Sequence, residues 1–334
     1  MPLDLPFVWA AIIAFAVLAY VVLDGFDLGV GILFPLLADR EERDVAMNTI
    51  APVWDGNETW LVLGGGGLFA VFPLAYAVLL PALYAPMIAM LLGLILRGVA
   101  FEFRWKTERG KFLWDWAFTC GSLIAAIAQG VALGALIQGI KVEGRAYAGG
   151  WLDWLTPFSL LTGIALVVGY ALLGATWLVW RTDGELQSRA YALARPLALA
   201  LLAAIGVVSL WTPLLNSQFL VRWFSWPAIL YVVPVPLLTL AAAARLVLSL
   251  RDRHEVMPFA MTLALFVLCY IGLGISLYPA IVPPAISIWD AAAPDKSLAF
   301  LLAGTAVLLP LIIAYTVFSY WAFRGKVRAG AGYH

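Results

Sequence analysis

The sequence predicts an all-α polytopic membrane protein with nine transmembrane helices, its N-terminus outside and its C-terminus inside. Composition is the first reason: the 334 residues are 64% hydrophobic and only 12% charged, whereas soluble domains are about 45–50% apolar and about 25% charged. The second is a set of nine apolar runs that are each long enough to cross a bilayer. The third is a strong bias of Lys and Arg toward alternate connections between those runs.

The runs are helices rather than barrel strands, because a hydrocarbon core about 30 Å thick requires roughly 20 helical residues and barrel strands are only about half as long. The first run lacks a basic n-region and is too long for a cleavable signal peptide, so it is interpreted as the first span. No polar stretch is long enough for a separate soluble domain. The nine predicted spans are 7–30, 57–80, 82–101, 115–138, 155–179, 192–214, 226–249, 257–279 and 298–321.

The distribution of basic residues fixes the predicted orientation. With the N-terminus outside, 16 of the 20 Lys and Arg residues lie on the inner side, as the positive-inside rule requires. The four on the outer side are Lys141, Arg145, Arg222 and Lys296. The net charge is zero, so no basic surface for nucleic acid is expected.

The first span carries two acids near its inner end, within "LDGFDLGVG". Asp24 and Asp27 are three residues apart and therefore share one helix face. Apolar residues continue as far as Leu37, so both acids are expected inside the protein. Gly25 and Gly29 form a pair of small residues that allows a close helix contact.

The second span begins with "WDGNETWLVLGGGG", which places Trp54, Asp55 and Glu58 at the same inner edge. An aspartate at a helix start commonly caps the helix and complements its dipole, so Asp55 has an ordinary structural explanation. The run Gly64 to Gly67 costs roughly 1 kcal/mol per glycine relative to alanine. This cost indicates that another backbone or a large flat group presses on the helix.

The third span ends with "RGVAFEFR" and adds Arg97, Glu102 and Arg104. An arginine at that depth requires a partner. On the predicted topology, the acids of the first three spans converge with Arg97 at the inner edge. Partly dehydrated carboxylates can exchange protons near neutral pH, and proton pathways through membrane proteins are built from them. The same spacing fits equally well with acids that only cap helices and pair with Arg97 and Arg104.

The later spans hold fewer candidates. Gln129 and Gln138 in the fourth span are expected to make polar contacts between helices. The two histidines, His254 in a polar loop and His334 at the last position, lie outside every predicted span. Haem and copper sites within membrane oxidases normally require histidine or methionine ligands, so no complete haem or metal site is expected on this chain.

The three motifs above also resemble a known family. "DGFDLGVG", "NTIAPVWDGNETWLVLGGGGLFAVFP" and "RGVAFEFR" closely resemble subunit II of cytochrome bd-type quinol oxidases, and "YPAIVPP" resembles a later outer segment of the same family. The resemblance covers essentially the whole chain. It implies one transmembrane domain made of a first four-helix bundle with the acidic cluster (1–138), a second four-helix bundle (155–279) and a peripheral ninth helix (298–321).

The resemblance also implies a function. The family forms a multi-pass oxidase of the bacterial inner membrane that oxidises quinol, reduces dioxygen to water and generates proton motive force without pumping. The haem-binding partner is subunit I, which implies b-type haems there and leaves open haem d, a bound quinone and a small single-span accessory subunit. Subunit II supports assembly and contributes a proton route from the cytoplasm. The alternative from a different class is a proton-coupled secondary transporter, which would also require intramembrane acids.

The family motifs match particular residues of this sequence. By resemblance, the proton pathway comprises Asp24, Asp27, Asp55, Glu58 and Glu102, with Trp54 and Arg97 in supporting positions or near a haem propionate. Glu102 stands where many members have Asp. Glu58 stands where the enterobacterial form has Gln, and "NETW" is similar to the cyanide-insensitive branch of the family.

Overall fold

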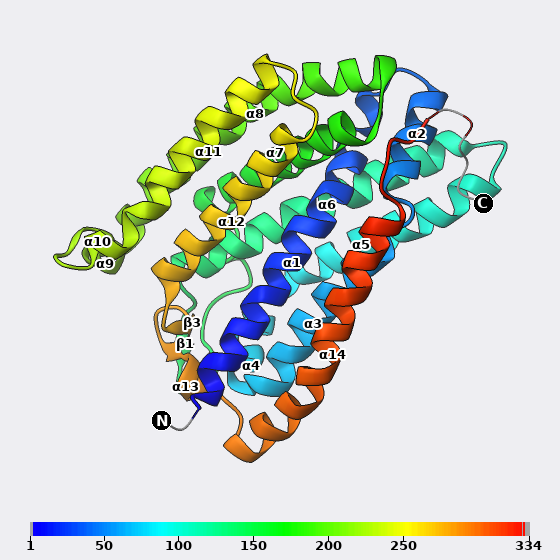
Figure 1. The fold of residues 1–334 in the computed structure, drawn as a ribbon. Coiled ribbons are helices and arrows are strands. Elements are labelled where there is room, and N and C mark those ends of the chain that lie inside the picture. Colours follow the sequence, from blue (N-terminus) through cyan, green and yellow to red (C-terminus); the bar gives the residue numbers. More distant parts are fainter. Residues whose placement is uncertain (1–2, 329, 331–334) are drawn as a thin grey trace.

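Long apolar helices run the length of the molecule in the computed structural model, which describes residues 3–328 and residue 330 (Figure 1). The elements in chain order are α1 Leu5–Leu33, η1 Phe34–Leu36, α2 Arg40–Ile50, α3 Trp54–Val71, α4 Pro73–Ala82, α5 Tyr84–Lys106, α6 Lys111–Gln138, β1 Val142–Glu143, β2 Ala146–Tyr147, α7 Pro157–Arg181, α8 Gly184–Leu215, α9 Ser217–Phe224, α10 Ile229–Val232, α11 Pro234–Arg251, α12 Met257–Leu277, β3 Ala280–Val282, β4 Ile286–Ser287, α13 Ile288–Ala291 and α14 Asp295–Ala322.

The number of candidate membrane spans agrees with the sequence except at one helix. Within the described residues, eight helices are long and apolar enough to cross a membrane, and the count becomes nine if the bent pair α3 and α4 is one span. The prediction of one continuous span over 57–80 was wrong, because α3 and α4 are bent by 119° at Phe72. Pro73 explains the break: the residue before a proline is disfavoured in the helical conformation, so α3 ends there.

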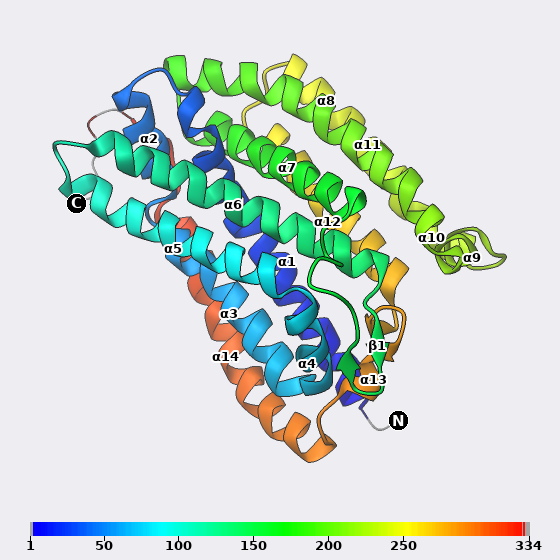
Figure 2. The same ribbon diagram turned by 180° about the vertical axis from the view of Figure 1, so that it is seen from behind.

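The chain alternates between two ends of the molecule (Figures 1 and 2). We call the end that carries α2 and the C-terminal segment the α2 end, and the opposite end, with the two small antiparallel sheets, the hairpin end. The sheets pair β1 with β2 and β3 with β4, and the second pair contains an irregularity between Ala280 and Val282. Local sequence fixes several helix starts; for example, Thr156 and Ser159 form a reciprocal capping box at α7.

Helices α1 and α7 cross at the centre of the fold with almost no space between their backbones. A Cβ atom added at Gly29 would lie 1.9 Å from the Tyr170 carbonyl oxygen, and one added at Gly174 would lie 2.4 Å from the Gly29 carbonyl carbon. The close contact predicted from Gly25 and Gly29 is therefore confirmed, and the partner is α7. Next to the crossing, Phe26 stacks on Trp177 with ring centroids 4.2 Å apart. This packing fixes the position of the α1 segment that carries the two aspartates.

The four-glycine run of α3 is only partly in contact with a neighbour. Cβ atoms at Gly64 and Gly67 would lie 3.3 Å from side chains of α1, whereas added Cβ atoms at Gly65 and Gly66 would have no described atom within 4 Å. The helix face that carries Gly64 and Gly67 thus allows α1 to approach closely. The face that carries Gly65 and Gly66 leaves a strip of exposed backbone, and the expectation of a second group against it stays a prediction.

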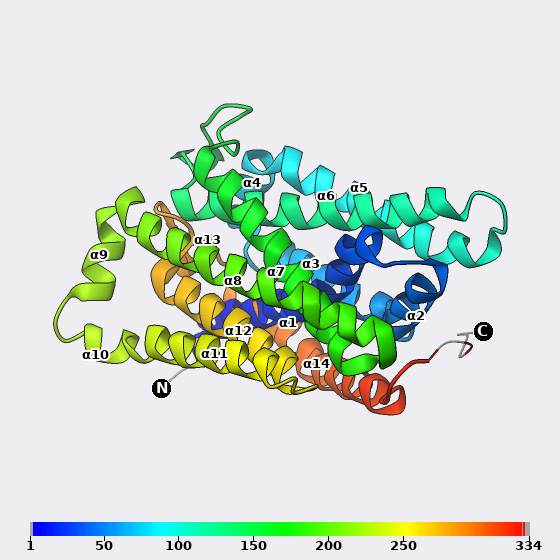
Figure 3. The same ribbon diagram turned by 90° about the horizontal axis from the view of Figure 1, so that it is seen from above.

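The remaining helices surround this centre. Figure 3 shows α5 and α6 along one edge and α11 and α14 along the opposite edge, with α1 and α7 between them. Helix α1 packs against α3, α6 and α7, and α7 also packs against α8 and α12. Helices α1 and α6 belong to the first predicted bundle and α7 to the second, so their contacts join the two bundles. The division of the chain into these two bundles stays a prediction. Helix α14 contacts α1 and α3 and buries only Leu298 completely.

Candidate functional site

A fully buried arginine lies among three carboxylates near the α2 end. Arg97 of α5 is 0% exposed. Its Nη1 lies 2.9 Å from Asp24 Oδ1 and 2.5 Å from Glu58 Oε1, and its Nη2 lies 3.8 Å from Asp27 Oδ2. Asp24 and Asp27 are also 0% exposed. One guanidinium thus serves three acids in a setting where unpaired charge is costly.

Three different helices build this cluster. The i, i+3 spacing of Asp24 and Asp27 turns both side chains toward α5, as predicted. Glu58 comes from the first turns of α3, and the Arg97 guanidinium carbon lies 5.9 Å from the centroid of the Trp54 ring. We refer to Asp24, Asp27, Glu58 and Arg97 as the Arg97 cluster.

Asn57 and Tyr320 extend the cluster toward α14. Asn57 Nδ2 donates to Asp27 Oδ2 at 2.6 Å and to the Leu23 carbonyl oxygen at 3.2 Å. The Tyr320 hydroxyl donates to Asn57 Oδ1 at 2.9 Å. Asn57 is 1% exposed, so its amide is committed to these partners. Sequence reasoning assigned no role to either residue. Tyr320 in particular looks like an ordinary interfacial aromatic at the end of the last span.

A second buried polar group lies one turn away on α1. Gln129 Nε2 donates to the Tyr20 hydroxyl at 2.7 Å, and the Tyr170 hydroxyl donates to Gln129 Oε1 at 2.7 Å. Tyr20 precedes Asp24 by four residues and therefore lies on the same helix face. Gln138 likewise donates to Thr156 at 2.7 Å. The interhelical role predicted for Gln129 and Gln138 is confirmed.

A pocket of about 710 Å³ opens beside the Arg97 cluster. It lies between α14 and the α2 ends of α3 and α5, and its lining includes Asp55, Asn57, Glu102 and Tyr320. Asn57 and Tyr320 thus face the pocket on one side and connect to Asp27 on the other. The two exposed carboxylates, Asp55 and Glu102, therefore line the same pocket as Asn57, whose amide is hydrogen-bonded to the buried Asp27.

Two of the predicted acids do not reach Arg97. Asp55 and Glu102 are exposed, and neither forms an ion pair with Arg97, so the expected convergence of all five acids on Arg97 was wrong for these two. Helix geometry explains Glu102: five residues from Arg97 correspond to about 140° of rotation, which turns it to a different face of α5. Asp55 lies one turn closer to the helix start than Glu58. Both instead line the pocket.

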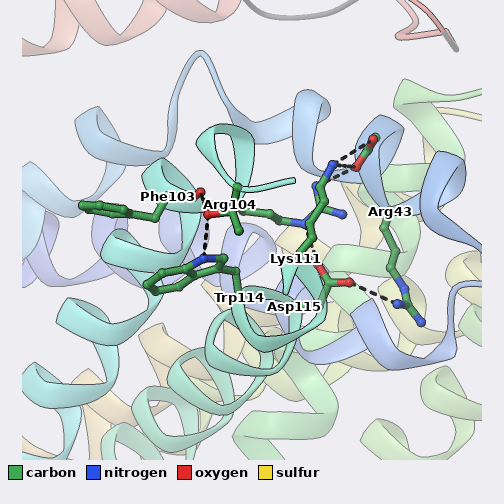
Figure 4. A network of polar contacts seen from close by, with 8 residues as sticks. Arg43, Phe103, Arg104, Lys111, Trp114 and Asp115 are labelled. Atoms are coloured by element: carbon green, nitrogen blue, oxygen red, sulfur yellow. Dashed lines mark hydrogen bonds and ion pairs between the residues drawn. The ribbon is translucent and has the colours of Figure 1, made fainter. Parts of the chain in front are cut away.

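Arg104 has its own partners (Figure 4). Its Nε lies 2.5 Å from Asp115 Oδ1 of α6, and its Nη1 lies 2.6 Å from Asp44 Oδ1 of α2. Lys111 and Arg43 pair with the same two carboxylates at 3.0 Å and 3.1 Å. The alternative, in which the motif acids pair with Arg97 and Arg104, is therefore wrong for Arg104. It holds for Arg97, which pairs with Asp24, Asp27 and Glu58. This network of ion pairs holds α2, α5 and α6 together at the α2 end.

The sequence comparison decides the family. The family described as "Cytochrome bd terminal oxidase subunit II" matches residues 5–323. The chain belongs to this subunit II family. It is 30% identical to "Cytochrome bd-I ubiquinol oxidase subunit 2" of Escherichia coli K12, covering 97% of this chain and 95% of the relative. It is also 30% identical to "Cytochrome bd ubiquinol oxidase subunit 2" of Bacillus subtilis, covering 96% of each.

The fold agrees with a solved structure of the same type. "The structure of bd oxidase from Geobacillus thermodenitrificans" contains a chain that matches with a TM-score of 0.69 at 19% identity, covering 96% of this subunit II and 99% of that chain. Within residues 3–328 and 330, this subunit II has no group of three or more His, Cys, Asp or Glu side chains that could hold a metal ion. His254 is exposed in the loop after α11, and His334 lies outside the described residues.

Proposed function

We propose that this chain is the subunit that assembles with a haem-binding subunit I in a quinol oxidase and supplies protons for the reduction of dioxygen to water. The relatives named as ubiquinol oxidase subunit 2 support the reaction. Haem in the partner would supply the electron transfer to oxygen. No observation on this chain favours the transporter alternative over the family assignment.

The Arg97 cluster carries the proton-route proposal. Three carboxylates share one buried guanidinium, and Asn57 and Tyr320 separate them from a pocket that presents Asp55 and Glu102. Protons would enter at the pocket, pass to Asp27 and Glu58, and continue through Asp24 toward the partner. Arg97 would keep the three carboxylates close together through its ion pairs, and each carboxylate would still be able to bind a proton. Intramembrane carboxylates in this arrangement are typical of proton relays.

The direction of transfer follows from the predicted orientation. The excess of Lys and Arg at the α2 end supports a cytoplasmic position for the pocket. Each dioxygen accepts four electrons and four protons to give two waters. If these protons come from the cytoplasm and quinol releases its protons outside, charge separation arises without a pump. The chain's task is then to bind protons at the α2 end and deliver them toward the oxygen-reducing site.

The proposal is tested with Asp55→Asn in the assembled oxidase. The exposed control is Asp153→Asn at the hairpin end, which makes the same chemical change far from the pocket. Reduced-minus-oxidised spectra measure the haem content, and quinol-driven oxygen consumption measures turnover per haem. We expect normal haem content in both variants and lower turnover per haem only in Asp55→Asn. Wild-type turnover in Asp55→Asn would remove Asp55 from the route, and haem loss would assign the residue to assembly.

A further inference from the structure

The last helix, α14, buries few of its residues and contributes one of them to the site. Only Leu298 of α14 is completely buried. Near its end, however, the Tyr320 hydroxyl donates to Asn57 Oδ1 at 2.9 Å. The Tyr320 ring also makes edge contacts with Phe26 and Trp177, at centroid distances of 6.3 and 6.4 Å. A helix at the edge of the fold therefore reaches a buried polar group, the amide of Asn57.

The hydrogen bonds of Asn57 can be arranged in only one way. The Leu23 carbonyl oxygen is an acceptor, so the Asn57 atom 3.2 Å from it must be the donor nitrogen. The same nitrogen donates to Asp27 Oδ2 at 2.6 Å, which leaves Oδ1 to accept from Tyr320. The Tyr320 hydroxyl thus supplies the last hydrogen bond of the Asn57 amide and keeps its Nδ2 directed toward Asp27. Without that hydroxyl, Oδ1 would lose its protein partner and face the pocket.

The segment after α14 holds Tyr320 in place. Arg181 Nη2 donates to the Phe323 carbonyl oxygen at 2.6 Å, and the Val327 amide donates to the Arg181 carbonyl oxygen at 2.8 Å. Lys326 Nζ pairs with Glu255 at 2.7 Å, and Arg328 Nε pairs with Asp183 at 2.9 Å. We call residues 323–328 the C-terminal strap. It ties the end of α14 to the α2 ends of α7, α8 and α12, one turn from Tyr320.

We propose that Tyr320 is a positioning residue of the proton route: through Asn57 it sets the arrangement in which Asp27 exchanges protons with the pocket. The inference rests on the proposed function. It assigns a role in that function to α14. The hydroxyl acts through the amide of Asn57 and makes no direct contact with Asp27 in the described part of the chain.

The test is Tyr320→Phe in the complete oxidase, because the change removes one hydroxyl and keeps the packed ring. The matched control is Tyr191→Phe on α8, a buried tyrosine whose hydroxyl has no hydrogen-bond partner in the described structure. We expect turnover per haem at saturating quinol to fall about three- to tenfold in Tyr320→Phe, with an unchanged KM for quinol and a displaced pH profile. A hydrogen bond in a buried network has an effect of this size on a rate that depends on it. Tyr191→Phe should retain wild-type turnover and pH profile.

A double variant separates positioning from a general structural role. If Tyr320 acts through Asn57, Asn57→Ala combined with Tyr320→Phe should be no slower per haem than Asn57→Ala alone. Multiplicative effects of the two changes would overturn the inference, as would wild-type turnover and pH profile in Tyr320→Phe. Slow turnover in Asp55→Asn together with normal Tyr320→Phe leaves the proton route standing and removes Tyr320 from it. Wild-type turnover in both variants removes Asp55 from the route and overturns the inference.

Discussion

The crossing of α1 and α7 gives the sharpest stability prediction. An alanine Cβ at Gly29 would lie 1.9 Å from the Tyr170 carbonyl oxygen, and real Cβ atoms essentially never approach closer than 3.0 Å. The two helices would have to separate by about 1 Å. The obstructing atom belongs to the backbone, so no side-chain rotation can relieve the clash, and the cost lies near the upper end of the roughly 1–3 kcal/mol typical of overpacking.

The gain in helix propensity offsets only part of that cost. Alanine is favoured over glycine by about 1 kcal/mol in a helix interior, so Gly29→Ala should destabilise the protein by about 2 kcal/mol. At roughly 2–4 °C per kcal/mol, the apparent Tm of the purified oxidase should fall by about 4 °C or more. Gly206→Ala on α8 is the control, because its Cβ would meet no described atom within 4 Å. Its Tm should be equal to or above that of the wild type.

Differential scanning fluorimetry of the assembled complex, with haem absorbance followed in parallel, measures both variants. Equal Tm values for Gly29→Ala and wild type would refute the packing argument. A loss of turnover per haem in Gly29→Ala is also expected, because the crossing lies within one helical turn of Asp27 and positions it against Arg97.

The other predictions concern the polar groups. Arg97→Met should reduce the yield of haem-bearing complex sharply, because breaking a buried ion pair costs about 3–5 kcal/mol and three carboxylates would stay uncompensated; a normal yield after affinity purification would contradict the description of the cluster. Gln129→Leu should lower thermal stability by about 1–3 kcal/mol, since the hydroxyls of Tyr20 and Tyr170 lose their common partner, whereas an unchanged melting curve would mean that water replaces the amide. The hydrogen bond from Lys326 lowers the pKa of Glu255, so the strap contact is present above the unfolded-state pKa and is lost as pH falls through the lowered one. Digestion with an acid-active protease should therefore cleave the strap more readily at low pH and in Glu255→Gln, and equal cleavage at all pH values would exclude this contribution.

The sequence predicted the parts of the structure that depend on composition and regular spacing. Runs of apolar residues determine where helices cross the bilayer, and the i, i+3 spacing of Asp24 and Asp27 determines that both face one partner. The small pair Gly25 and Gly29 identified the face of close approach. The family motifs covered the same residues and placed the chain in the subunit II family.

Other features depend on contacts that no single-helix pattern contains. The bend at Phe72 was missed because the run is apolar throughout and hydropathy alone predicts one span. The conformational effect of Pro73 on the preceding residue is what breaks the helix. Glu102 was expected at Arg97 because depth along the helix was considered without rotation about its axis. Tyr320 lies 263 residues from Asn57 in the chain, so nothing in its local sequence points to the site. Asp44 and Asp115 were missed as partners of Arg104 for the same reason.

Proton uptake during a single turnover tests the proton route most directly. Fully reduced oxidase is mixed with oxygen in weak buffer, a pH-indicator dye follows protons taken from solution, and haem absorbance follows electron transfer. Entry through the pocket predicts that Asp55→Asn slows proton uptake relative to the wild type while the early haem oxidation keeps its rate. Proton uptake at the wild-type rate in Asp55→Asn, with haem content intact, would contradict a route that begins at Asp55.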